Sequence, residues 1–220
     1  KWVIEAKKDR KARLIVVDPR RIELVSSPHI RARHHLQLRP GSNVAFVNAM
    51  AHVIVSEGLE DREFIARRCD QASFQKWLEF IRDPRYAPEQ VTGVTGIDPE
   101  ALRAAARLYA TGGNGAIYYG LGVTEHSQGS TMVMGIANLA MLTGNIGKHG
   151  AGSHTWAGNY KGALLQASAW SGPGVGSYTH EDPFDSSTWE FTYDGLVSIG
   201  VDSFTSEPGV CFAAVGTVRP

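Results

Sequence analysis

Two patterns in the sequence have residue types that could bind a phosphorylated ligand. Between Ile117 and Lys161, glycines occupy two turns on either side of an apolar segment. Such turns let backbone amides approach phosphate groups closely, because glycine has no Cβ. The second pattern, LIVVDPRR, runs from Leu14 to Arg21 and is a short β-branched stretch that ends in polar residues. Buried parallel strands deliver polar side chains to their carboxyl edge in this way, so the two patterns together predict a large nucleotide-bearing cofactor.

Composition and charge limit the class of protein. The chain has 220 residues, 43% of them apolar, and its 22 basic and 22 acidic side chains balance to zero net charge. This is an ordinary globular composition with no electrostatic case for nucleic acid, although residues 1–39 are locally basic and could form either a solvated face or a surface that attracts polyphosphate. No apolar run approaches the roughly 20 residues of a membrane helix, so we expect no direct membrane insertion. Lys1 and Pro220 do not look like natural ends, and we expect a fragment of a longer chain.

The cysteines and histidines predict no metal site within this chain. Cys69 and Cys211 are far apart and outside any C-x-x-C spacing, so neither a zinc site nor an iron–sulfur cluster can be built from them. Both are expected to be plain buried thiols. The histidines are scattered, apart from the adjacent pair His34 and His35, and none has the H-E-x-x-H spacing.

Hydrophobic periodicity and turn residues predict alternating helices and strands. Strands are expected at Leu14–Val17, 36–38 and 116–119. Helices are expected over residues 1–11, from Asn43 to a stop at Glu57-Gly58, over 61–68 and 72–80, from the Asp98-Pro99-Glu100 start through 110, and over 129–142. Pro84 and Pro88 interrupt the pattern, and beyond Gly144 no period is sustained. The alternation predicts an α/β fold with parallel strands, whose ligands bind at the carboxyl edge.

Four motifs in order carry a family resemblance: VVDPRR, LRPGSN, GLGVTEHSQG and ANLAMLTGNIGKHGAG. Together they resemble the large subunit of molybdopterin oxidoreductases, the dimethyl sulfoxide reductase superfamily, and within it most closely the catalytic subunits of formate dehydrogenases. The resemblance covers roughly residues 1–155. It implies an α/β dinucleotide-binding-like part over residues 1–150 and a loop-rich active-site funnel segment over 151–220 that enters the next domain. From about Ser186 onward no family pattern is found.

The resemblance implies a bis-molybdopterin guanine dinucleotide cofactor that carries molybdenum or tungsten. It also implies a [4Fe-4S] cluster and a metal ligand in a segment before Lys1, a small-molecule substrate, and an iron–sulfur electron-transfer subunit as partner. Asp18 would accept hydrogen bonds from the guanine base, and Asn43 stands where the family usually has Asp, a stronger acceptor. The residues that the resemblance assigns to the cofactor are Asp18, Arg20, Gly41, Ser42, Asn43, Gly120, Gly122, Glu125, Thr143, Gly144, Asn145 and Gly147.

The sequence departs from formate dehydrogenases after the KHGAG turn. Those proteins typically continue with a segment like NPLRGQNN, whose arginine holds formate beside the metal, whereas Ala157 occupies the arginine position here. A guanidinium makes a planar bidentate contact that no other side chain reproduces. His154 and Lys161 could supply positive charge instead, and they are the candidate catalytic residues. The resemblance therefore supports the superfamily more strongly than it supports formate as the substrate.

Three other functions stay open or are disfavoured. A hydratase or transhydroxylase relative would keep the cofactor without net redox chemistry, and the replaced arginine leaves this open. A cofactor-free structural homologue in a respiratory complex, such as the large iron–sulfur subunit of NADH dehydrogenase, has an empty pocket that need not retain glycines. The glycines at positions 120, 122, 144 and 147 therefore argue against it. A plain NAD-dependent enzyme is disfavoured, because Gly120 and Gly122 are not followed by a third glycine at Glu125. The sequence leaves open the choice of metal and whether the protein works in the cytoplasm or the periplasm.

Overall fold

The computed structural model describes residues 2–9, 11–125, 127–148 and 151–156. The helices are α1 (Trp2–Asp9), α2 (Glu23–Ser26), α3 (Asn43–Ser56), α4 (Arg62–Arg68), α5 (Gln71–Ile81), the 3₁₀ turn η1 (Pro84–Tyr86), α6 (Pro88–Thr95), α7 (Pro99–Thr111), α8 (Leu121–Thr124) and α9 (Gly129–Leu142). The strands are β1 (Ile15–Val17), β2 (His34–Leu36), β3 (Ala116–Gly120) and β4 (Gly152–Trp156).

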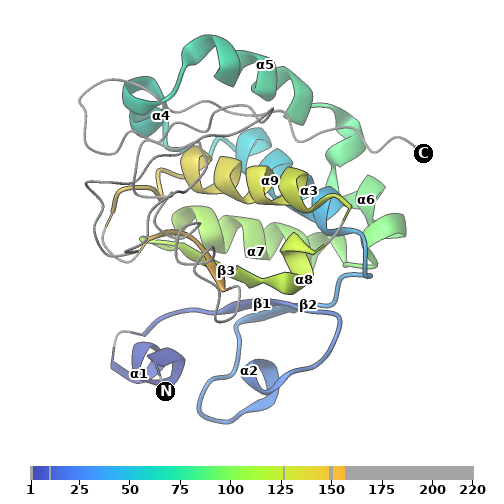
Figure 1. The fold of residues 1–220 in the computed structure, drawn as a ribbon, viewed down its shortest axis with the longest axis vertical. Coiled ribbons are helices and arrows are strands. Elements are labelled where there is room, and N and C mark those ends of the chain that lie inside the picture. The colour runs from blue at the N-terminus through green and yellow to red at the C-terminus, as the bar shows by residue number, and fades with distance from the viewer. Residues whose placement is uncertain (1, 10, 126, 149–150, 157–220) are drawn as a thin grey trace, which may run out of the picture.

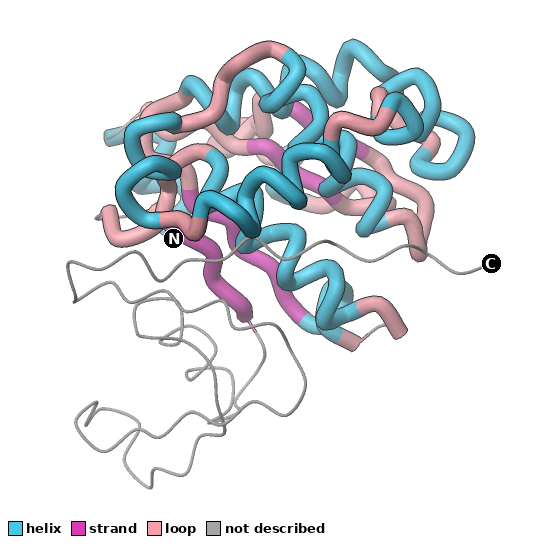
Figure 2. The backbone as a smooth tube through the Cα atoms, turned by 90° about the horizontal axis from the view of Figure 1, so that it is seen from above, coloured by secondary structure: helices cyan, strands magenta, loops and turns pink. Residues whose placement is uncertain are grey.

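The strands form two small parallel sheets. β1 pairs with β2, with Ile15 opposite His34, and β3 pairs with β4, with Ala116 opposite Gly152. Figure 2 shows the two pairs of strands as separate groups among the helices. The predicted α/β class with parallel strands is confirmed.

Helices α3, α7 and α9 build the centre of the molecule (Figure 1). The residues of α3 and α9 are themselves apolar and buried on nearly all faces of the helix, which is the pattern of helices enclosed in a core. α5 covers them from above with Trp77 and Ile81, and α7 packs through Leu102. The two sheets lie below these helices, so the core holds the ends of the strands in fixed positions.

Aspartate side chains cap the starts of three helices, of which the sequence predicted the one at Asp98. The Asp98 carboxylate accepts a hydrogen bond from the backbone N–H of Ala101 (2.9 Å) at the start of α7, which confirms the predicted Asp-Pro-Glu start. At the start of α4, the Asp61 carboxylate accepts from the backbone N–H of Phe64. At the start of α5, the Asp70 carboxylate accepts from the backbone N–H of Ser73. These caps satisfy backbone donors that would otherwise have no partner in the helix.

Several elements differ from the sequence-based expectation, and the short helices α2, η1 and α8 were not expected at all. α6 begins at Pro88, where only an interruption was expected, because proline is well tolerated in the first helical turn. β2 lies two residues earlier than expected, since its pairing with β1 sets its position. β4 lies in a stretch without hydrophobic period; hydrogen bonding to β3 makes it a strand.

In the described part of the chain, none of the helices is both long and apolar enough to cross a bilayer. Cys69 is buried, as expected for a plain thiol, whereas Cys211 lies outside the described residues.

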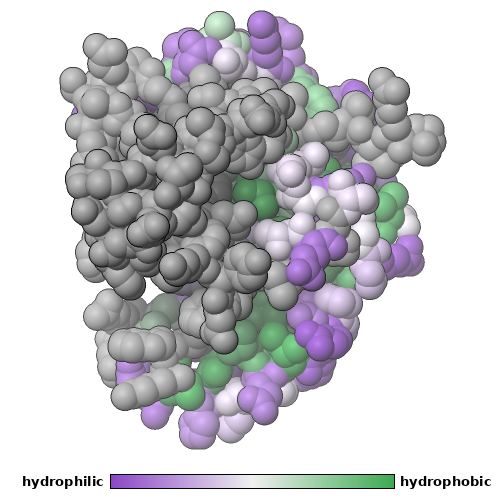
Figure 3. Space-filling model, in the orientation of Figure 1, coloured by the Kyte–Doolittle hydropathy of each residue, from purple (hydrophilic) through white to green (hydrophobic). Residues whose placement is uncertain are grey.

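On the face shown in Figure 3, hydrophobic residues are visible near the β1–β2 sheet, among hydrophilic neighbours.

A bidentate ion pair joins the ends of α3 and α7, and it predicts a pH dependence. Arg107 donates to both carboxylate oxygens of Glu57, at 2.7 and 2.8 Å. These hydrogen bonds hold the pKa of Glu57 below its ordinary value of 4.5, against a smaller opposing effect of burial. The pair therefore stabilises the fold above pH 4.5, and this contribution is lost as the pH falls through the lowered pKa.

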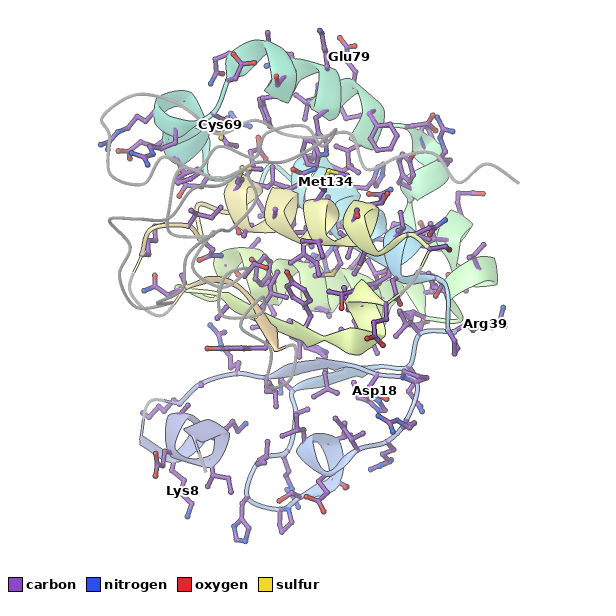
Figure 4. All side chains as sticks on the ribbon, in the orientation of Figure 1. Lys8, Asp18, Arg39, Cys69, Glu79 and Met134 are labelled. Atoms are coloured by element: carbon purple, nitrogen blue, oxygen red, sulfur yellow. The ribbon has the colours of Figure 1, made fainter. Side chains whose placement is uncertain are left out.

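The Glu57→Gln variant is expected to show a shallower fall of melting temperature below pH 4.5 than the unmodified protein. Glu79→Gln is the charge control, because Glu79 is an exposed residue on α5, a different helix from those that carry the pair (Figure 4). Thermal unfolding between pH 3 and 7, roughly the range of carboxylate titration, measures the effect. Parallel curves for the two variants would contradict the prediction.

Candidate functional site at the carboxyl edge

The ends of β1 and β3 and the starts of α3 and α9 lie on one side of the molecule (Figure 1). Asp18 follows β1 there, and Arg39 precedes the start of α3 on the same side (Figure 4). This is the carboxyl edge of both parallel sheets, where α/β proteins bind their ligands.

Asp18 forms a tight turn with Arg20. Its Oδ1 accepts hydrogen bonds from the backbone N–H of Arg20 (2.7 Å) and from Nε of the same residue (3.3 Å). Partial burial acts to raise the pKa of Asp18, but the hydrogen bonds and charge of Arg20, with a smaller effect of His35, lower it overall. The carboxylate is 23% exposed and the Arg20 side chain 80% exposed, so both can reach a ligand.

The turn before α3 is held by Arg39. The backbone N–H of Arg39 donates to the carbonyl of Thr95 (2.8 Å), and its Nη1 donates to the carbonyl of Gly93 (2.6 Å). The Ser42 hydroxyl donates to the Arg39 carbonyl (2.6 Å) and leaves the first turn of α3 without a side-chain cap. Arg39 thereby fixes the Pro40–Asn43 turn against the end of α6.

Replacing Gly96 by alanine is expected to loosen this turn. Gly96 has φ +73°, and a Cβ there would lie 3.2 Å from Nε and 3.3 Å from Cγ of Arg39. Left-handed backbone costs an alanine about 1–2 kcal/mol, and the crowded arginine must also move. We expect a lower melting temperature and faster hydrogen exchange at Ser42 and Asn43.

Gly58→Ala is the matched control for Gly96→Ala. Gly58 has a similar φ of +66°, but its Cβ would meet only Arg62, at an ordinary 3.8 Å. It is expected to lower stability without changing exchange in the turn before α3. Equal exchange in both variants would show that Arg39 does not hold the turn.

A small cavity of about 150 Å³ lies between the starts of α3 and α9. Its lining residues are Gly41, Asn43, Val44, Val123, Ser127, Gln128 and Met132. Neither Ser42 nor Gln128 caps its helix with a side-chain hydrogen bond, so N–H groups of two 14-residue helices are left for other acceptors. Such helix starts favour anionic groups.

Two glycines leave open space at this edge. Gly41 has φ +86°, and a Cβ at Gly41 or at Gly122 would meet nothing within 4 Å. A ligand could therefore approach the backbone at both turns. Glu125 is exposed and directly follows the short helix α8, which contains Gly122. The structure thus brings together Asp18, Arg20, Gly41, Ser42, Asn43, Gly120, Gly122 and Glu125 on one side.

The remaining four candidates lie at the other end of α9. α9 has 14 residues, so Thr143, Gly144, Asn145 and Gly147 lie roughly 20 Å from the start of that helix. The side chains of Thr143 and Asn145 are buried and hydrogen-bonded to each other. Burial raises the pKa of the nearby Tyr109 to about 12, against a smaller opposing effect of Thr143 and Asn145.

A larger cleft of about 340 Å³ lies beside this second group, between α4 and residues 146–148. Two of its three basic side chains pair with acids of the same cleft, Arg67 with Glu63 (3.2 Å) and Lys148 with Asp61 (3.5 Å). These charges are therefore paired within the protein, although the Arg67 and Glu63 side chains are 73% and 81% exposed.

The candidate catalytic residues lie at the edge of the described part of the chain or beyond it. His154 lies on β4, where only its backbone is described, and Lys161 and Ala157 lie outside the described residues. No group of three or more His, Cys, Asp and Glu side chains that could hold a metal ion occurs in the described ranges.

Sequence reasoning missed three contributors to the carboxyl edge. Ser127 and Gln128 line the cavity from the residues just before α9, and Arg39 holds the turn before α3. Ser127 and Gln128 could have been found from the sequence, because they directly precede the predicted start of the helix at Gly129. The role of Arg39 depends on α6, whose existence the sequence did not indicate.

An α/β unit with glycine turns and free helix starts at its carboxyl edge is typical of proteins that bind nucleotide-bearing cofactors. The chain belongs to the molybdopterin oxidoreductase family, because the sequence model of that family matches residues 2–191.

Relatives in this family include formate dehydrogenases. The chain is 43% identical over 150 residues to formate dehydrogenase H of Escherichia coli, covering 68% of this chain and 20% of the relative. It is 40% identical over 158 residues to the F420-dependent formate dehydrogenase subunit alpha of Methanocaldococcus jannaschii, covering 71% of this chain and 22% of the relative. The chain thus spans about a fifth of these relatives.

A solved structure supports the fold. Acetylene hydratase from Pelobacter acetylenicus superposes with a TM-score of 0.59 and 28% sequence identity, over 67% of this chain and 19% of that one. The predicted superfamily is confirmed by the family match, and its α/β fold by this likeness.

Proposed function

We propose that this chain is part of the catalytic subunit of a molybdenum or tungsten oxidoreductase that resembles formate dehydrogenases and uses a bis-molybdopterin guanine dinucleotide. The observation that supports this most directly is the gathering of three motifs at one carboxyl edge. Asp18, the Gly41–Asn43 turn and the Gly120–Glu125 segment lie on that side of the molecule, and residues of the last two line one cavity beside two uncapped helix starts.

The residues at this edge fit a guanine dinucleotide. Asp18 is ionised at neutral pH and partly exposed, as an acceptor for the N–H groups of guanine must be. The N–H groups at the starts of α3 and α9 suit phosphates, and Gly41 and Gly122 admit a ligand to the backbone. Arg20 adds a positive charge that can reach the same ligand.

When bound, the cofactor would supply the redox chemistry at its metal, while the protein orients it and excludes water. In the proposed arrangement, Asp18 and Asn43 orient the guanine end, and the Gly120–Glu125 loop approaches the pterin. His154 and Lys161 supply positive charge near the substrate, in place of the arginine that Ala157 replaces. We also propose that a [4Fe-4S] cluster outside this chain and an iron–sulfur subunit carry the electrons; the relative from M. jannaschii is itself named as a subunit alpha.

Elemental analysis of the complete protein, purified without oxygen, tests this proposal. About one molybdenum or tungsten and about four irons per chain are expected, together with GMP released by acid hydrolysis. Iron without either heavier metal would favour a cofactor-free structural homologue instead.

A non-redox hydratase or transhydroxylase is the second candidate, favoured by two observations. The structural likeness is to an acetylene hydratase, and Ala157 stands at the formate-binding arginine position. Turnover of a neutral substrate without any electron acceptor would support this candidate, whereas formate-dependent reduction of a dye would support the first.

A further inference from the structure

The turn after α9 is tightly determined although it lies far from the carboxyl edge. Gly144 has φ +62°, and the backbone N–H of Asn145 donates back to the carbonyl of Ala140 (2.7 Å). Asn145 is 1% exposed, so its side chain faces the interior of the described fold. A side chain in this position contacts protein atoms rather than solvent.

Both polar atoms of the Asn145 amide are used. Oδ1 accepts from the backbone N–H of Gly115 (2.9 Å), and Nδ2 donates to Oγ1 of Thr143 (2.9 Å). The Thr143 hydroxyl in turn donates to the carbonyl of Leu139 (2.9 Å) on α9. A single side chain thus joins the last turn of α9 to the residue before β3.

Gly115 links this side chain to both strands of the second sheet. Its N–H binds Asn145, and its carbonyl accepts from the N–H of Gly152 (3.1 Å), where β4 begins. A Cβ at Gly115 would lie 2.9 Å from Nδ2 of Asn145 and 2.8 Å from the Tyr109 ring, so only glycine permits this approach. The register Ala116 to Gly152 starts at this point.

The opposite side of the turn is held by Asp61. Its backbone N–H donates to the carbonyl of Leu142 (2.8 Å), and its carboxylate lies 3.5 Å from the Lys148 amine. The turn is therefore held from both sides, by Asn145 and by Asp61. β4 runs parallel to β3, so it carries the chain from this turn to the carboxyl edge.

We propose that Asn145 is a positioning residue, which sets the register of β4 against β3 and thereby the point at which β4 arrives at the carboxyl edge, the side of the proposed active site. The family resemblance assigns Asn145 and Thr143 to the cofactor; in this proposal their side chains act through β4 instead. The part that concerns the active site rests on the proposed function. The part that concerns the register rests on the contacts alone.

Two variants in the complete, cofactor-loaded protein test the proposal. Asn145→Leu keeps the branched shape of the side chain but removes both hydrogen bonds, whereas Asn145→Asp keeps the acceptor for the Gly115 N–H. In Asn145→Leu we expect about tenfold or faster hydrogen exchange at the amides of β3 and β4, with unchanged exchange in α3. We also expect a lower kcat, changed Mo(V) or W(V) resonance parameters and unchanged GMP content. Asn145→Asp is expected to restore most of the slow exchange and of the kcat.

Ile81→Ala is the control for general loss of stability, because Ile81 is fully buried on α5, away from β3 (Figure 1). Exchange in β4 that stays slow in Asn145→Leu, or that rises equally in Ile81→Ala, would overturn the proposal. A protein without molybdenum or tungsten would overturn the proposed function, while the exchange comparison would still decide the role of Asn145 in the strand register.

Discussion

Gly144→Ala is expected to lower the free energy of unfolding by about 2–5 kcal/mol, the largest effect of any glycine replacement in the second group of candidates. Two costs combine. The backbone at φ +62° is unfavourable for alanine, and the new Cβ would lie 2.2 Å from Oδ2 and 2.8 Å from Cγ of Asp61. Asp61 cannot move freely, because its Oδ1 caps α4 and its N–H binds the carbonyl of Leu142.

Gly147→Ala is the control that separates these two costs. Gly147 has φ +71°, close to the value at Gly144, but a Cβ there would meet nothing within 4 Å. It should show only the backbone cost of about 1–2 kcal/mol. The denaturation midpoints of the two variants, measured in the complete protein at the same cofactor content, make the comparison. Equal losses would mean that Asp61 yields more easily than its hydrogen bonds indicate.

The second large effect is expected at Asp18, on the retention of the guanine nucleotide that the proposed cofactor carries. A hydrogen bond to a charged group contributes about 1.5–3 kcal/mol, so Asp18→Asn should weaken retention about 10- to 100-fold. The amide keeps one acceptor, which can still bind the Arg20 N–H that Oδ1 binds now at 2.7 Å. The local turn is thereby preserved while the negative charge is removed.

Asp98→Asn is the control for Asp18→Asn. Asp98 caps α7, where asparagine is as good a cap as aspartate. GMP and metal per chain are measured after repeated dilution and concentration of each variant. If Asp18→Asn retains as much GMP as Asp98→Asn, the carboxylate does not hold the nucleotide, even if the protein contains the cofactor.

Most helices could be predicted from the sequence because their signals are local. Asp98-Pro99-Glu100 carries a cap, a first-turn proline and an acid, and α7 begins there. The spacing of apolar residues from Asn43 and from Gly129 marked α3 and α9 with the observed bounds. α6 was missed because Pro88 was interpreted as a break, although the same residue is favourable at a helix start.

The candidate site could be predicted only in part. Motifs after strands identified the residues around Asp18, Asn43 and Gly122, since parallel strands bring their carboxyl ends to one edge. The motif that contains Gly144 follows a helix rather than a strand, and the structure places it at the opposite end. Sequence order alone did not distinguish these two situations.

The sequence by itself determined the family, the α/β class, the helix starts and the set of polar residues that follow the strands. Only the tertiary structure decided that Arg39 holds the turn before α3, and that Asn145 joins α9 to β3. It also decided that the residues of β4 form a strand. The physical reason is range: caps and turns depend on neighbours within a few residues, whereas these contacts join residues 30 to 54 positions apart, which only the packed core brings together.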